Sequence, residues 1–167
     1  MDKIRLNLGS EDNVLDGFEN LDPRWEQFKD LGVKSWGGWN APIPYEDGSV
    51  ELVVVQHVLM YCAREDYDRN LHEIHRVLCQ GGMLILKEEN NKIYQWRKLG
   101  TKHKSGHICG STNPEEIIPI LEKNNFKIIN SDPKIIVEKY NKNQRVINRL
   151  PKLFKGKLFV LECEKIV

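Results

Sequence analysis

The sequence of 167 residues has few cysteines and no long apolar run. The four cysteines form no C-x-x-C pair, which argues against a structural zinc site and a disulfide framework. No apolar run reaches the length of a membrane span, and the first residues lack the apolar region of a signal peptide. The net charge of +1 gives no general attraction to nucleic acid or membranes. We therefore expect a cytoplasmic protein with one domain, residues 1–167, and no metal site.

The apolar pattern predicts strands that alternate with helices. Residues 50–55 are a nearly continuous branched apolar run, as in a strand buried on both faces. Residues 66–78 have helical spacing, and Gly81-Gly82 is expected to end that helix. Further strands are expected at 4–8, 18–21, 83–86, 126–129 and 158–163, and further helices at 23–31 and 114–123. The predicted fold class is α/β, with a mostly parallel central sheet flanked by helices.

The first 22 residues carry the strongest local pattern. The strand over 4–8 leads into a turn at Gly9, and the next short strand ends at Asp22. A glycine that lets the backbone come close to a ligand, followed by a carboxylate at the end of the next strand, is typical of a site for a ribose-bearing cofactor. The alternative is a plain strand-to-loop turn. The 13 residues from Gly9 to Asp22 are too few for a full crossover helix, so we expect a shortened helix or a loop.

Several motifs in sequence order resemble class I S-adenosylmethionine-dependent methyltransferases. They are Leu6-Asn-Leu-Gly9, Gly17-Phe-Glu-Asn-Leu-Asp22, Pro42-Ile-Pro-Tyr45, the segments 49–59 and 71–84, and Phe159-Val-Leu-Glu-Cys163. The short first crossover fits one branch of that family. The resemblance implies a Rossmann-like fold with an antiparallel last strand, S-adenosylmethionine as the cofactor, and methyl transfer to an acceptor.

The resemblance also implies roles for individual residues. Leu8, Gly9 and Ser10 would lie beside the methionine part of the cofactor, and Asp22 would accept hydrogen bonds from the ribose hydroxyls. Trp39 and Asn40 would lie near the adenine, and Gln56 and His57 would face the reacting methyl group. Trp36 and Trp39 flank a Gly-Gly pair, so stacking on a flat ligand and packing in the core are alternatives for them.

Candidate substrate residues have alternative structural roles. His57 is the candidate general base, because an unperturbed histidine has a pKa of about 6.5; the alternative is a histidine that caps the strand end. Tyr61 is expected to contact substrate or to pack on the protein. His103 and His107 are expected to contact substrate or to lie in an ordinary loop, without metal. The polar side chains of 69–76, among them His75 and Arg76, are predicted to form a solvated helix face.

Two departures from the family pattern leave the function open. Glu11 stands where the family usually has glycine, near the expected cofactor carboxylate, and the N-terminal helices that commonly cover the substrate are missing. The acceptor is expected to be a small molecule or a glycan, with a homo-oligomer as one way to complete the site. One alternative is an RNA methyltransferase that uses a basic hairpin-like insertion over about 139–157. The other is a non-catalytic binding or regulatory module.

Overall fold

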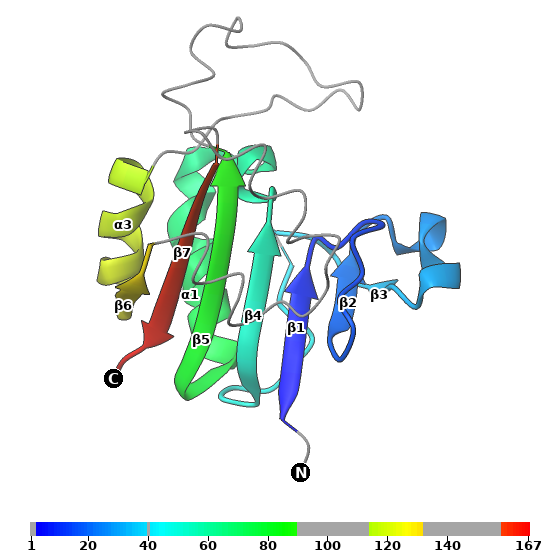
Figure 1. The fold of residues 1–167 in the computed structure, drawn as a ribbon, viewed down its shortest axis with the longest axis horizontal. Coiled ribbons are helices and arrows are strands. Elements are labelled where there is room, and N and C mark those ends of the chain that lie inside the picture. Colours follow the sequence, from blue (N-terminus) through cyan, green and yellow to red (C-terminus); the bar gives the residue numbers. More distant parts are fainter. Residues whose placement is uncertain (1–2, 40, 90–113, 132–157) are drawn as a thin grey trace, which may run out of the picture.

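The computed structural model describes residues 3–39, 41–89, 114–131 and 158–167. These residues form one seven-stranded sheet with two α-helices and four short 3-10 turns (Figure 1). The strands are β1 (Ile4–Leu8), β2 (Glu19–Asp22), β3 (Lys34–Ser35), β4 (Val50–Gln56), β5 (Leu78–Glu89), β6 (Phe126–Asn130) and β7 (Leu158–Lys165). The helices are α1 (Tyr67–Val77) and α3 (Pro114–Lys123), and the 3-10 turns are η1 (Trp25–Gln27), η2 (Lys29–Leu31), η3 (Leu59–Tyr61) and η4 (Arg64–Asp66).

The sheet confirms the predicted α/β fold and the antiparallel last strand. Its strand order is β3-β2-β1-β4-β5-β7-β6. All neighbouring pairs from β3 to β5 are parallel, whereas β7 pairs antiparallel with both β5 and β6. The carboxyl ends of β1, β2, β4 and β5 therefore lie along the same edge, at the top of Figure 1.

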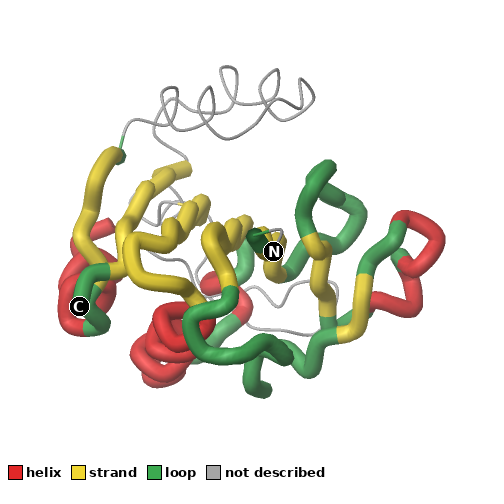
Figure 2. Tube along the Cα trace, turned by 90° about the horizontal axis from the view of Figure 1, so that it is seen from below, coloured by secondary structure: helices red, strands yellow, loops and turns green. Residues whose placement is uncertain are grey.

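Apolar side chains cover both faces of the sheet. The larger cluster includes Leu6, Val53 and Leu86 from the strands and Leu71 and Ile74 from α1. Figures 1 and 2 show α1 and α3 on the same face of the sheet. The second cluster consists of strand residues whose side chains point to the opposite face, together with side chains from the loop between β1 and β2. Its members are Leu15, Leu52, Val54, Ile85 and Val160, with Phe18 and Met83 packed against them.

Two predicted elements differ from the structure. Residues 23–31 form the two 3-10 turns η1 and η2 instead of a single helix. The helix over 67–77 ends at Val77, before the Gly81-Gly82 pair, because Leu78 already has extended backbone and pairs with Val50. Gly81 instead lies inside β5 with a φ of 71°, where the register with β4 shifts. The glycine pair therefore forms an irregularity in a strand and does not end the helix.

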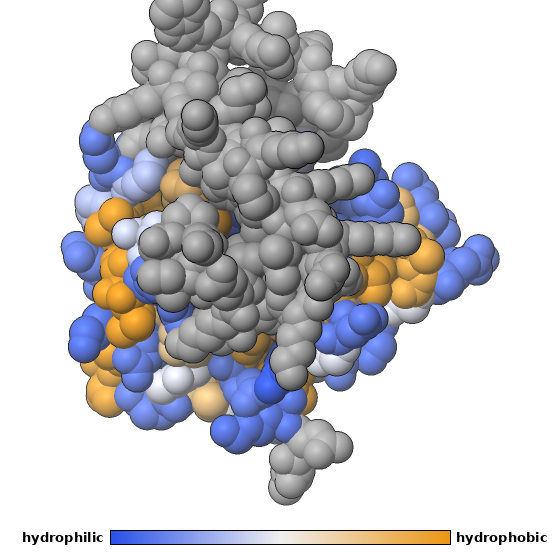
Figure 3. Space-filling model, viewed as in Figure 1, coloured by the Kyte–Doolittle hydropathy of each residue, from blue (hydrophilic) through white to orange (hydrophobic). Residues whose placement is uncertain are grey.

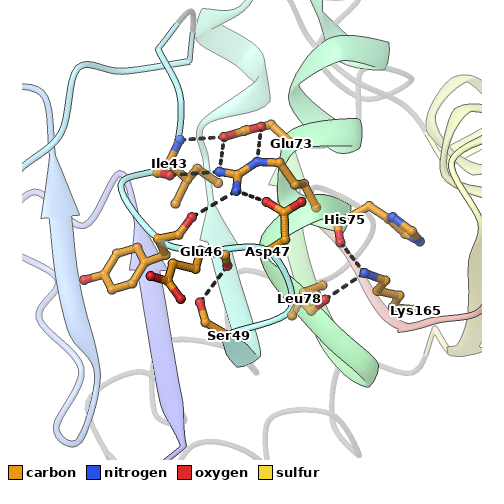
Figure 4. A network of polar contacts seen from close by, with 10 residues as sticks. Ile43, Glu46, Asp47, Ser49, Glu73, His75, Leu78 and Lys165 are labelled. Atoms are coloured by element: carbon orange, nitrogen blue, oxygen red, sulfur yellow. Dashed lines mark hydrogen bonds and ion pairs between the residues drawn. The ribbon is translucent and has the colours of Figure 1, made fainter.

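The end of α1 is tied to the loop before β4 by the Arg76 guanidinium (Figure 4). It donates to the backbone carbonyls of Ile43 and Tyr45, each at 3.0 Å, and to the carboxylates of Glu73 and Asp47. The backbone N–H of Ile43 completes the network by donating to Glu73 at 2.8 Å. His75 packs edge-on against Phe126, with 5.4 Å between ring centroids. The predicted solvated face is therefore wrong for His75 and Arg76.

Few large apolar side chains of the described residues are exposed. They are Leu31, Tyr61 and Ile129, together with the consecutive Ile166 and Val167 at the end of the chain. Figure 3 shows hydrophobic and hydrophilic residues interspersed over the coloured part of this face. No helix in the described ranges is long and apolar enough to cross a membrane.

Candidate functional site

Most of the predicted site residues with described positions lie along the carboxyl edge of the sheet. Three of these residues end neighbouring strands: Leu8 ends β1, Asp22 ends β2 and Gln56 ends β4. Strand β1 lies between β2 and β4 and pairs with both. Gly9 and His57 each follow directly after their strand. In parallel α/β sheets, ligands bind in the crevice outside this edge. The topology therefore brings these predicted residues together, although they are up to 49 positions apart in the sequence.

The turn after β1 requires glycine for two reasons. Gly9 has a φ of 68°, in the left-handed region, and its N–H donates to the Leu21 carbonyl at 2.8 Å. A Cβ at this position would lie 2.6 Å from Cγ2 of Val58, the residue that follows His57. The turn of β1 therefore packs directly against the turn that follows β4.

Ser10 presents a buried hydroxyl beside this turn. The residue is 2% exposed. Its backbone N–H donates to the Leu21 carbonyl at 3.1 Å, but its Oγ has no hydrogen-bond partner within the described ranges. Because buried hydroxyls almost always have a partner, this atom marks a place for a polar group that is not part of those ranges.

Asp22 places a buried carboxylate at the end of β2. The residue is 2% exposed. Its Oδ1 accepts the backbone N–H of Arg24 at 2.7 Å, and its Oδ2 accepts that of Glu11 at 3.1 Å. A carboxylate has about four acceptor positions, so each oxygen retains capacity for a further donor such as a ribose hydroxyl.

Glu11 has the backbone conformation of a glycine position. Its φ is 45°, which is unusual for a residue with a side chain. Its carboxylate forms an ion pair with the Arg24 guanidinium. The negative charge that we expected near the cofactor carboxylate is therefore paired within the protein.

The loop between β1 and β2 contains no helix and is held by two buried asparagines. Asn20, which is 5% exposed, receives hydrogen bonds from the Asn7 amide at 2.8 Å and the Leu15 N–H at 2.9 Å. Its own amide donates to the carbonyls of Leu15 at 3.2 Å and Phe18 at 3.1 Å. The Asn7 amide also donates to the Asn13 carbonyl at 2.9 Å. This side-chain network replaces the crossover helix, as the short spacing predicts.

We expect Asn20→Ala to destabilise the protein by about 2–4 kcal/mol, because it leaves buried backbone and side-chain groups without partners. Urea unfolding of the two proteins measures this change. Asn20→Asp keeps the acceptor oxygen but loses the two donors, so it should lie between wild type and Asn20→Ala. Equal stability of wild type and Asn20→Ala would contradict the role given to this network.

The two tryptophans before β4 have different environments. Trp36 is buried in the main core, and Trp39 is half-buried and packs edge-on against it, with 4.8 Å between ring centroids and 81° between planes. Core packing is therefore the observed role of Trp36. The contact of Trp39 with adenine stays a prediction, and Asn40 lies outside the described residues.

His57 follows β4 in a strained backbone conformation. Its φ is 54°, and its N–H donates to the Lys87 carbonyl at 2.9 Å. Burial, reinforced by the nearby Lys87 ammonium, lowers the pKa of His57 to about 4. The pKa of His57 therefore lies below the ordinary value of about 6.5, and the imidazole is neutral at pH 7. Within the part of the chain that the structure describes, the backbone N–H of His57, and not its imidazole, forms the hydrogen bond at the strand end.

Sequence reasoning missed two residues at the end of β5. Glu88 is fully buried, and its Oε1 accepts the backbone N–H groups of Val58 at 2.8 Å and Leu59 at 2.9 Å. Lys87 pairs in register with Gln56, and its ammonium donates to the Gln56 Oε1 at 3.4 Å. The sequence signal that could have identified Lys87 and Glu88 is their position directly after the apolar run Leu84-Ile-Leu86. Charged residues there face the ligand edge of a parallel sheet.

We expect Glu88→Ala to destabilise the protein by about 3–5 kcal/mol, because two buried N–H groups lose a charged acceptor. Glu88→Gln keeps an acceptor oxygen and should lose less than half of that amount. Urea unfolding provides the measurement, with Glu122→Ala on the exposed side of α3 as the matched control. Similar losses of stability for Glu88→Ala and Glu122→Ala would contradict the role of Glu88 in holding the turn after β4 by its two hydrogen bonds.

The remaining predicted residues are not part of the described edge. Tyr61 is an exposed residue of η3, and its contact with substrate stays a prediction. His103, His107 and the basic segment 139–157 lie outside the described residues. Within the ranges that are described, no three His, Cys, Asp or Glu side chains are arranged to hold a metal ion.

Comparison with known proteins supports the same family. A family model described as "Methyltransferase domain" matches residues 36–86, from the tryptophan loop to β5. Comparison with curated protein sequences found no match.

Solved structures match the chain over nearly its full length. A methyltransferase from Methanosarcina mazei is 17% identical, with a TM-score of 0.72 over 99% of this chain and 93% of that one. A Thermotoga maritima protein described as a possible histamine N-methyltransferase is 17% identical, with a TM-score of 0.68 over 99% and 83%. The protein solved with the Haloferax volcanii Trm112 methyltransferase activator is 13% identical, with a TM-score of 0.68 over 99% and 83%.

These likenesses establish the fold, and the family model covers the segment that carries the central motifs. They confirm the resemblance to S-adenosylmethionine-dependent methyltransferases that was found in the sequence. Residues 36–86 therefore match a methyltransferase domain, and the chain has the Rossmann-like fold of the S-adenosylmethionine-dependent methyltransferases that it resembles.

Proposed function

We propose that this methyltransferase acts on a small-molecule or glycan-type acceptor, at an oxygen or a nitrogen. The group formed by Gly9, Ser10 and Asp22 at the carboxyl edge of the sheet supports the cofactor-dependent part of this proposal, methyl transfer itself. The description of the Thermotoga maritima protein as a possible histamine N-methyltransferase supports a small acceptor. The extent of the domain, residues 1–167, and a homo-oligomer remain parts of the proposal.

The residues present fit the cofactor. Gly9 turns the backbone at the end of β1 with a φ of 68°, the buried Ser10 hydroxyl is available for a polar group, and Asp22 retains acceptor positions for ribose hydroxyls. When bound, S-adenosylmethionine supplies a methyl group on a positively charged sulfur. Leu8, Gly9 and Ser10 would hold its methionine part, Asp22 its ribose, and Trp39 with Asn40 its adenine.

The protein's task is to align the acceptor and to handle its proton. Alignment of two reactants at close range removes much of the entropic barrier to their reaction. His57 is neutral at pH 7, so its imidazole has a free nitrogen lone pair for the proton of the acceptor. Its low pKa makes it a weak base, which suits an acceptor that loses its proton only as the new bond forms. Gln56 beside it would orient the acceptor.

The two rival hypotheses have no specific observation in their favour. The RNA hypothesis rests on the basic segment 139–157, which lies outside the described residues. The non-catalytic hypothesis rests in part on Glu11, whose carboxylate is paired with Arg24. Both hypotheses give different results from the proposed function in a direct assay.

The test is release of S-adenosylhomocysteine in the presence of separate acceptor pools: small amines, small hydroxy acids, oligosaccharides and RNA. We expect turnover with one of the first three pools, and loss of turnover in Asp22→Ala. Turnover with RNA alone, suppressed by raised salt, would support the nucleic-acid hypothesis. Cofactor binding without turnover in any pool would favour the non-catalytic module.

A further inference from the structure

Lys87 places a positive charge at the acceptor side of the edge. It lies near the end of β5, in register with Gln56 on β4 and Val160 on β7. By strand alternation it shares the sheet face of Ile85, so its stem leaves the apolar cluster of Leu52, Val54, Ile85 and Val160 at the carboxyl edge. The residue is half-buried.

Lys87 forms no ion pair within the described ranges, although the nearby Glu88 favours its charged form against the larger effect of burial. The contact of its ammonium there is the neutral Gln56 Oε1, at 3.4 Å, which is long for a charge-assisted hydrogen bond. The neighbouring Glu88 belongs to the opposite face of the strand and binds the N–H groups of Val58 and Leu59. Glu162, two residues beyond the register partner of Lys87, is buried and has interactions of its own.

Two uncharged side chains that can donate hydrogen bonds, Gln56 and His57, lie near this ammonium. Because the Gln56 oxygen faces Lys87, the two amide hydrogens of Gln56 are left for another acceptor. His57 is neutral and carries one ring N–H. Burial lowers the pKa of Lys87, and Lys87 in turn contributes to the low pKa of His57. A positive charge that is partly removed from water, with donors beside it, favours a bound anion.

We propose that Lys87, with Gln56 beside it, binds an oxyanion of the acceptor, a carboxylate or a phosphate. This inference rests on the proposed function, because it assigns the group to the methyl acceptor. The positively charged sulfur of the cofactor and the ammonium would then attract the same negatively charged acceptor. A positively charged acceptor would be repelled by both.

The test observes the His57 ring by NMR in the protein without cofactor, while sodium phosphate replaces sodium chloride at constant ionic strength. The signal is assigned with His57→Gln. We expect the chemical shift of the wild-type His57 ring to change saturably with phosphate. The phosphate affinity derived from it should be at least about tenfold weaker in Lys87→Met, since a charged hydrogen bond contributes about 1.5–3 kcal/mol. Lys127→Met, an exposed lysine on β6, is the matched control and should behave as wild type.

Two readouts decide the outcome. Lys87→Met should also raise the pKa of His57 from about 4, because a nearby positive charge is removed. The same phosphate affinity in Lys87→Met, or no saturable shift in wild type, would overturn the proposal. Sodium acetate in place of phosphate distinguishes the two oxyanions. This experiment contains no cofactor, so a lack of phosphate binding at Lys87 is distinct from a lack of S-adenosylmethionine binding. A separate titration measures S-adenosylmethionine binding.

Discussion

Asp22→Ala should bind S-adenosylhomocysteine at least about 100-fold more weakly than wild type, because two hydrogen bonds to a charged acceptor contribute about 3–6 kcal/mol together. The buried carboxylate ends β2 at the ligand edge, and its oxygens already accept the N–H groups of Glu11 and Arg24. The same substitution removes these two bonds, so the local turn also loses support. Calorimetric titration measures the affinity, and urea unfolding measures the loss of stability.

Two control variants separate binding from folding in this experiment. Asp22→Asn keeps the side-chain shape and one acceptor oxygen, so it should preserve most of the stability while it still weakens binding. Asp16→Ala alters an exposed aspartate of the same loop and should change neither quantity. Wild-type affinity in Asp22→Ala would show that the ribose does not bind at the end of β2.

The second large effect is expected at Gly9. Gly9→Ala adds a Cβ at a φ of 68° and 2.6 Å from Cγ2 of Val58. The left-handed conformation costs about 1–2 kcal/mol for a residue with a side chain, and overpacking adds about 1–3 kcal/mol. The substitution should therefore destabilise the protein by about 2–5 kcal/mol and also weaken binding of S-adenosylhomocysteine.

Gly17 supplies a matched control for this substitution. It has a φ of 78°, but a Cβ there meets no heavy atom within 4 Å. Gly17→Ala should therefore show only the conformational cost of about 1–2 kcal/mol. Combining Gly9→Ala with Val58→Ala should recover part of the loss, as a favourable coupling energy. Equal losses at both glycines would contradict the close contact between the two turns.

The strands and the ligand edge were predictable because their signals are local. A run such as 50–55 is long enough and apolar enough to specify a buried strand, and strand ends then specify one edge. The same argument placed Gly9 and Asp22 together, and the family resemblance added Gln56. The lack of a full crossover helix between β1 and β2 was predictable from length alone, since a spacing of 13 positions leaves no room for a full helix and a strand. Length did not decide between a shortened helix and the loop that the structure has.

The interactions that depend on distant residues were not predictable. The role of Arg76 requires the carbonyls of Ile43 and Tyr45, more than 30 positions away, so its helix position alone suggested exposure. The low pKa of His57 arises from burial and from Lys87, which tertiary structure alone brings close. Gly81-Gly82 has the composition of a helix end, but pairing of Leu78 with Val50 overrides it.

The most direct test of the central claim is calorimetric titration of the wild-type protein with S-adenosylmethionine and, separately, with S-adenosylhomocysteine. We expect saturable binding of both ligands with dissociation constants in the micromolar range, and loss of that binding in Asp22→Ala. Absence of binding of either ligand to the folded wild-type protein would contradict the assignment of a cofactor site to the carboxyl edge of this sheet.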